Sequence, residues 1–244
     1  MYFFKPCRVK NWELQVHFKI FGKAKDLYGD GLAIWYAKQP LATGSVFGSV
    51  DYFHGLGIFL DTYANQNGPH NHGHPYISAM INNGSLHYDH DRDGTHTELA
   101  GCEAKFRNAD HDTHLSIRYE KDVLTVSVDI EGKNAWKECF SVKQVRLPTG
   151  YFFGASATTG ELSDNHDIIS IRLYELEVPD EKKAVDCKEN KAKFLKGMAC
   201  ISWISTQDIL CTAYVRPEVE YASEAFITIS RDKFGKIGYF PDLL

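Results

Sequence analysis

Residues 56–65 of the chain read LGIFLDTYAN, an apolar run that ends at Asp61 and is followed by Asn65. A second apolar run, 76–81, continues through a turn sequence and ends in a polar cluster, Asp89-His90-Asp91-Arg92-Asp93-Gly94. Two strand-like segments therefore each end in carboxylate or amide oxygens. Because calcium takes about six to eight oxygen ligands from such groups, residues 51–94 predict a calcium site.

Strand patterns continue on both sides of this segment. Apolar and polar residues alternate with period two over 12–20, and 32–36 is a short apolar run after the turn-like Gly29-Asp30-Gly31. Residues 37–50 predict a loop, and later strand-like runs cover 112–119, 123–130, 138–145, 151–157 and 167–178. Short strands joined by Gly, Asp and Asn turns predict an all-β fold, an antiparallel sandwich or a barrel.

The character of the chain changes after Val178. A charged linker at 179–183 is followed by a short helical pattern at 188–196 and by residues 197–244, which show no clear period. We therefore expect one domain at 1–178, with a linker and an unassigned tail at 179–244.

Composition and charge argue against several classes of protein. The net charge of −5 favours neither nucleic acid nor an anionic membrane surface as a partner. No run approaches the roughly 18 apolar residues of a membrane span, and the first residues do not resemble a signal peptide. Six cysteines without metal-site spacing fit either a secretory domain with disulfides or a cytosolic domain with buried thiols. Asn83-Gly84-Ser85 is a glycosylation sequon.

Several separate motifs, in order along the chain, resemble the L-type (legume-lectin-like) animal lectins, and they look closest to the vesicular integral-membrane branch of that family. They cover roughly residues 7–178 and are found at 29–36, 46–49, 57–63, 88–90, 106–108, 147–151 and 160–167. The resemblance implies a two-sheet β-sandwich with a legume-lectin-like jelly roll. It also implies calcium-dependent binding of high-mannose N-glycans on glycoproteins that move between the endoplasmic reticulum and the Golgi, which is a lectin function and not an enzymatic one.

The resemblance also implies site residues, carried over motif by motif. The family's calcium ligands fall on Asp61, the backbone carbonyl of Tyr63, Asn65 and Asp93, and a disulfide is implied between Cys102 and Cys139. Its sugar contacts fall on Asp51, Asn65, His90, Gly160, Glu161 and Leu162. A mannose presents vicinal hydroxyls, which suit an acceptor carboxylate, an amide that both donates and accepts, and the backbone groups of a glycine loop.

The chain departs from the family pattern at both ends. The family's signal peptide and first strands, one of which carries a serine contact to the sugar, have no counterpart before Cys7. The family is anchored by a transmembrane helix and carries a sorting tail, and the sequence from Lys188 onward resembles neither. We therefore expect an N-terminally shortened lectin domain with an unrelated tail.

Each motif also has a simpler structural interpretation. Asp61 and Asp93 could be ordinary turn residues at strand ends, and Gly29-Asp30-Gly31 is most simply a tight turn. His90 alone could be a surface histidine. The alternating His70, His72 and His74 resemble a zinc-binding pattern because imidazole suits that metal, but without cysteine we expect a solvated loop.

Two competing functions follow from the same sequence. A glycoside hydrolase on a similar sandwich needs two carboxylates about 5 to 5.5 Å apart, and Glu161 and Asp164 lie in an expected loop and not alternately on one strand. A non-binding fragment, without its first strands, would leave an open sheet edge that invites aggregation.

Overall fold

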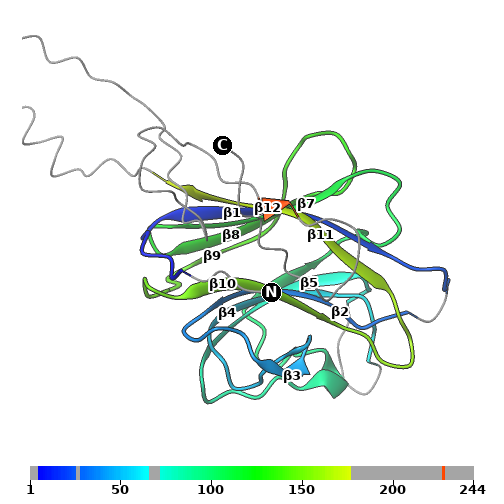
Figure 1. Ribbon diagram of the computed structural model, residues 1–244, viewed down its shortest axis with the longest axis horizontal. Helices are drawn as coiled ribbons and strands as arrows, with labels where there is room; N and C mark the ends of the chain where they lie inside the picture. Colours follow the sequence, from blue (N-terminus) through cyan, green and yellow to red (C-terminus); the bar gives the residue numbers. More distant parts are fainter. Residues whose placement is uncertain (1–4, 26–27, 66–71, 177–226, 229–244) are drawn as a thin grey trace, which may run out of the picture.

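The structure is a computed structural model that describes residues 5–25, 28–65, 72–176 and 227–228, and every structural statement below concerns these residues. Two antiparallel sheets lie face to face, one above the other in Figure 1. This confirms the predicted all-β sandwich.

One sheet has six strands in the order β12-β11-β1-β7-β8-β9. Its strands are β1 (Trp12–Phe21), β7 (Thr113–Glu120), β8 (Val123–Asp129), β9 (Lys137–Lys143), β11 (Asn165–Glu175) and the two-residue β12 (Ile227–Thr228). In β1 buried and half-buried residues alternate without a break, because one face of this sheet packs on the core and the other does not.

The other sheet has five strands in the order β10-β2-β4-β5-β6. They are β2 (Gly31–Ala37), β4 (His54–Asp61), β5 (Tyr76–Asn83), β6 (Ala100–Glu103) and β10 (Phe152–Thr158). Every residue of β2 is buried, since both faces of this sheet are covered. Beneath it in Figure 1 lie the short β3 (Thr43–Val46) and the 3₁₀ helix η1 (His90–Arg92).

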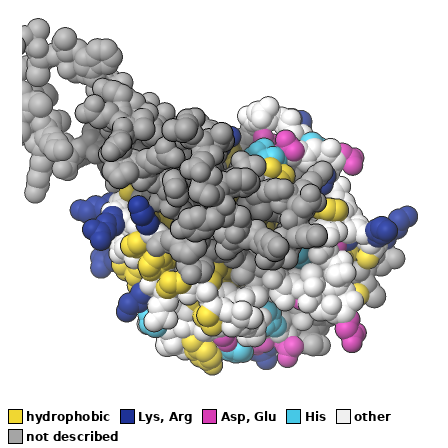
Figure 2. All heavy atoms as spheres, in the orientation of Figure 1, with side chains coloured by type: hydrophobic (Ala, Val, Ile, Leu, Met, Phe, Trp, Pro, Cys, Tyr) yellow, Lys and Arg dark blue, Asp and Glu magenta, His cyan; other side chains and the backbone are white. Residues whose placement is uncertain are grey.

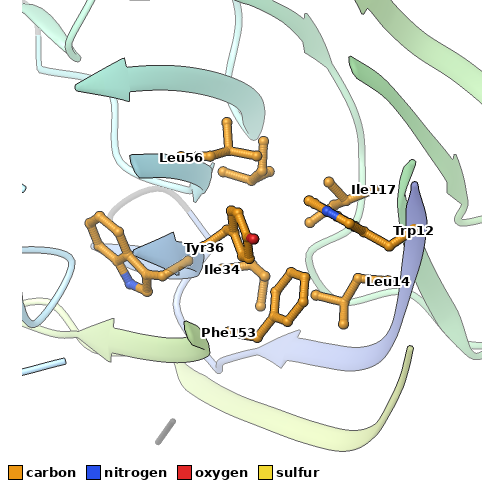
Figure 3. Close-up of a pocket in the computed structure, with 9 residues that line it drawn as sticks. Trp12, Leu14, Ile34, Tyr36, Leu56, Ile117 and Phe153 are labelled. Atoms are coloured by element: carbon orange, nitrogen blue, oxygen red, sulfur yellow. The ribbon is translucent and has the colours of Figure 1, made fainter. Parts of the chain in front are cut away.

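The space between the two sheets is a packed apolar core. Figure 3 shows side chains from both sheets that point toward one another, among them Trp12, Tyr36 and Phe153. The Trp12 ring lies 5.2 Å from Tyr36 and 4.8 Å from Phe153, measured between centroids. The space that these side chains line has no room for a water-sized molecule, as expected of a close-packed core.

A second apolar cluster lies on the other side of the five-stranded sheet. It consists of Ala33, Trp35, Val46, Phe47, Phe53, Phe59, Met80 and Tyr88. Its members come from β2, β4 and β5 and from the segments around β3 and η1. This cluster fixes the segment before β4 and the segment after β5 against the sheet.

A disulfide joins Cys102 of β6 to Cys139 of β9, the pair that the resemblance implies. It connects an edge strand of one sheet to an edge strand of the other. Cys7 is buried in the core. The two sheets are therefore held at one side by a covalent bond as well as by their core.

The strand predictions were wrong in three places. Residues 37–50, expected as a loop, contain β3, and β6 was not predicted. Residues 85–88, taken as the end of a strand-like run, are not a strand, because Asn82 caps the end of β5 by accepting hydrogen bonds from the backbone of the turn that follows. The predicted helix at 188–196 and nearly all of the 179–244 tail lie outside the described residues. No helix in the described ranges is long and apolar enough to cross a membrane.

Candidate functional site

Two buried aspartates form the centre of the site. Asp61 is the last residue of β4, and Asp93 ends η1 in the left-handed conformation. They are only 7% and 5% exposed, respectively. Burial raises the pKa of Asp61 well above its ordinary value, and the nearby negative charge of Asp93 raises it further. Buried like charges need a compensating cation, so this pair fits a metal ion.

Asn65 ties the loop after β4 to η1. Its backbone N–H donates to both carboxylate oxygens of Asp93, at 3.0 and 3.2 Å. The backbone N–H of Tyr63 donates to Asp61 Oδ1 at 3.0 Å. The structure thus brings together four residues predicted as calcium ligands, Asp61, Tyr63, Asn65 and Asp93. Residues 66–71 of the same loop, His70 included, lie outside the described part of the chain.

His74 joins this group, and the expectation of a solvated loop is wrong for it. Its side chain is 5% exposed, and its Nε2 lies 3.9 Å from Asp61 Oδ2 and 3.7 Å from Asp93 Oδ2. The register explains the placement, because Asp61 pairs with Tyr76 and the start of β5 therefore lies beside the end of β4. His72 instead stacks on Tyr76, with 3.7 Å between ring centroids.

Asp30 lies beside the loop of residues 61–65, called the metal loop below because it carries predicted calcium ligands, and Asp30 itself was not among the predicted site residues. Its backbone carbonyl accepts hydrogen bonds from the backbone N–H and the hydroxyl of Thr62, both at 3.0 Å. Burial raises the pKa of its carboxyl group, and the nearby His90 partly lowers it. The pairing of Gly31 with Asp61 places Asp30 at the same sheet edge as the metal loop, so the tight-turn interpretation was incomplete.

His90 belongs to the same region. Its ring packs on Tyr88 and Phe47, with centroids 4.8 and 6.0 Å away. Its Nε2 is buried and has no hydrogen-bond partner among the described residues. A buried imidazole nitrogen without a partner is a candidate contact for a polar ligand.

The loop formed by Gly160, Glu161 and Leu162 closes the other side of Asp30. The Gly160 N–H donates to the Leu162 carbonyl at 3.2 Å, and a β-carbon at Gly160 would lie 3.8 Å from the Asp30 carboxylate. Two backbone hydrogen bonds fix this arrangement, from Asp30 N–H to the Thr158 carbonyl and from Asp164 N–H to the Gly29 carbonyl, each 3.2 Å long. The loop predicted to contact a sugar therefore lies beside Asp30, at the same sheet edge as Asp61.

The structure does not place Asp51 with these residues. One carboxylate oxygen accepts from the backbone N–H groups of Tyr52 and Tyr88, at 2.8 and 3.0 Å, and the other contacts His87. Its oxygens thus connect its own loop to residues 87 and 88, which follow β5. The predicted glycosylation site Asn83 is exposed at the end of β5, where its side chain accepts from the Ser85 hydroxyl. In Figure 2, histidine and acidic side chains appear near the end of the molecule that carries β3 and η1.

Comparison with known proteins gives the family. The sequence model of the Legume-like lectin family matches residues 1–183. The chain is 57% identical over 198 residues to "Vesicular integral-membrane protein VIP36" of Homo sapiens, covering 79% of this chain and 55% of that protein. It is also 57% identical over 182 residues to "VIP36-like protein" of Homo sapiens, covering 73% and 52%. The chain thus spans about half the length of the curated relatives it matches.

Solved structures agree with this result. The VIP36 exoplasmic/lumenal domain in its Ca²⁺/Man-bound form is 58% identical, with a TM-score of 0.72 and 73% of each chain covered. The Ca²⁺/Man2-bound form of that domain is 57% identical, with a TM-score of 0.70 and 74% of each chain covered. The sequence motifs, the two-sheet sandwich and these matches lead to one conclusion: the chain belongs to the legume-like lectin family.

Proposed function

We propose that residues 1–178 form a calcium-dependent lectin domain for high-mannose N-glycans, with 179–244 as a linker and tail. The observation that carries the proposal is the convergence of a buried carboxylate pair with Asp30, His90 and the loop of Gly160 at one sheet edge. The relatives solved with Ca²⁺ and mannose support the same assignment.

Asp61, Asn65, Asp93 and the Tyr63 carbonyl would hold the calcium ion. When bound, calcium supplies the positive charge that the two buried carboxylates require. The hydrogen bond from Asn65 to Asp93 then keeps the metal loop against η1, which carries His90. In this way the residues of the metal loop position the residues that would contact a sugar.

The sugar-binding role assigned to Asp51 is better filled by Asp30. Asp30 lies between His90 and Gly160, and its carboxylate can accept hydrogen bonds from two vicinal hydroxyls of a mannose. Asn65 adds an amide, His90 a ring nitrogen, and the loop of Gly160 to Leu162 its exposed backbone groups. The hydroxyls of a sugar suit these groups because each group can donate or accept a hydrogen bond.

The ligands of this lectin domain would be glycoproteins of the early secretory pathway. The domain would sort them between the endoplasmic reticulum and the Golgi. The disulfide between Cys102 and Cys139 supports an oxidising compartment, and the exposed Asn83 is accessible to glycosylation. The hydrolase alternative finds no support here, because Asp164 is fully buried and paired with Arg107 and cannot act beside Glu161 as a second catalytic carboxylate.

Titration calorimetry with an α1,2-linked mannobiose tests the proposal, first in calcium and then with excess chelator. We expect heat of binding in calcium, none in chelator, and none in either Asn65→Ala or Asp30→Asn. Asp51→Asn is the matched control and should bind like the unmodified chain. Absence of heat from a chain that melts cooperatively in calcium would refute the proposed function, and loss of binding in Asp51→Asn alone would restore the role of Asp51.

A further inference from the structure

Asp61 and Asp93 face an imidazole as well as the calcium loop. Asp61 Oδ2 and Asp93 Oδ2 lie 3.9 and 3.7 Å from His74 Nε2. The other oxygen of Asp61, Oδ1, accepts instead from Tyr63. The three potential ligand atoms lie within 4.8 Å of one another, all on side chains that are at most 10% exposed.

These separations match the coordination shell of a small dication. Zinc binds nitrogen and oxygen ligands at about 2.0–2.2 Å, so neighbouring ligands around a tetrahedron are roughly 3.4 Å apart. The observed 3.9 and 3.7 Å exceed that value by only a few tenths of an ångström, which small side-chain rotations can close. A nitrogen donor also changes selectivity, because calcium prefers oxygen ligands whereas imidazole suits zinc and its first-row neighbours.

The hydroxyl of Tyr88 is a second, independent indication of a ligand at this point. Tyr88 is 2% exposed, and its hydroxyl has no hydrogen-bond partner in the part of the chain that the structure describes. The Tyr88 ring lies against Gly94, the residue after Asp93, since a β-carbon at Gly94 would lie 2.8 Å from Tyr88 Cζ. Burial raises the pKa of this phenol, and the negative charges of Asp61 and Asp93 raise it further. A buried hydroxyl beside two carboxylates fits a metal site completed by a bound water.

We propose that Asp61, His74 and Asp93 form a binding site for a first-row transition-metal dication of the zinc type, with His74 Nε2 as its nitrogen ligand. The proposal shares two aspartates with the proposed calcium site but does not require that the chain bind glycans. His74 therefore makes the metal centre of this chain chemically different from one that offers oxygen ligands alone.

Titration of the metal-free full chain with Co²⁺ tests this, because cobalt replaces zinc and its visible absorption reports nitrogen ligation. We expect His74→Gln to weaken Co²⁺ binding at least about tenfold, since loss of even an indirect supporting group costs that much at a metal site. His72→Gln is the matched control, because the neighbouring His72 ring stacks on Tyr76. The His72→Gln variant should bind Co²⁺ like the unmodified chain. Zn²⁺ should displace the cobalt from this variant and from the unmodified chain.

A crystal of the unmodified chain grown with Zn²⁺ gives an answer that does not depend on how the variants fold. An anomalous peak between Asp61, His74 and Asp93 is expected, and a peak absent from that position would overturn the proposal. Equal Co²⁺ affinity in His74→Gln and the unmodified chain would also overturn it. Mannobiose binding in calcium is measured separately. If the chain binds no mannobiose but binds cobalt in a way that depends on His74, the proposed function is refuted and the proposed metal site is supported.

Discussion

The ion pair of Arg107 and Asp164 offers the most informative perturbation of the loops around Asp30. Arg107 donates to the two carboxylate oxygens at 2.7 and 2.8 Å, and also to the Ala24 carbonyl at 3.0 Å. The Asp164 side chain is fully buried and that of Arg107 only 7% exposed. Arg107→Met should therefore leave an uncompensated buried charge, and we expect the free energy of unfolding to fall by about 3–5 kcal/mol.

Urea denaturation of the single and double variants measures this effect. Replacing both partners, as in Arg107→Met with Asp164→Leu, should cost much less than the single change, because an apolar pair leaves no buried charge. Arg118→Met is the control: its pair with Glu120 is exposed, with the arginine side chain 46% accessible, so its loss should cost below about 1 kcal/mol. Equal losses for Arg107→Met and Arg118→Met would refute the reasoning.

Three further predictions concern stability. The Cys102–Cys139 disulfide closes a loop of 37 residues. Replacing both cysteines by alanine should lower the free energy of unfolding, measured by chemical denaturation, by about 4 kcal/mol. Chelation of calcium should lower the melting temperature, because calcium at 100 times its Kd adds about 2.7 kcal/mol to the free energy of unfolding. In the Asp61→Asn variant, chelator should leave the melting temperature unchanged. Burial lowers the pKa of His166, so the unfolded chain binds more protons and stability falls below pH 6.5. His166→Gln should flatten that fall in urea midpoints measured between about pH 7 and 5.

Most of the fold could be predicted because strand periodicity is local. The alternation in residues 12–20 and the apolar run at 32–36 match β1 and β2 to within a residue at each end. The two missed strands, β3 and β6, have four residues each, and their sequences contain glycine. Four-residue segments carry too little periodicity to be recognised, and β6 is a strand because β5 offers it a partner.

The site was predicted less completely because it depends on which strands are neighbours. The predicted calcium ligands Asp61 and Asp93 stand in polar clusters after strand-like segments and are visible in the sequence, whereas Asp30 and His74 stand next to strands whose pairing was not known. Once Gly31 pairs with Asp61, and Asp61 with Tyr76, both residues must lie at the edge where β4 ends. Asp51 illustrates the opposite difficulty, since a carboxylate in a suitable motif can accept hydrogen bonds from neighbouring backbone, here from Tyr52 and Tyr88.

The same pairing explains why metal binding and sugar binding should be coupled in this chain. Thr62 lies between the metal residue Asp61 and the loop of Asn65, and it donates two hydrogen bonds to the carbonyl of Asp30. Asp30 is in turn held beside Gly160 by the hydrogen bond from its N–H to the Thr158 carbonyl. Any displacement of the metal loop is therefore transmitted to the carboxylate that would accept the sugar hydroxyls. Under the proposed function, calcium would control the affinity without contacting the sugar, because it would fix the backbone to which Asp30 is bonded.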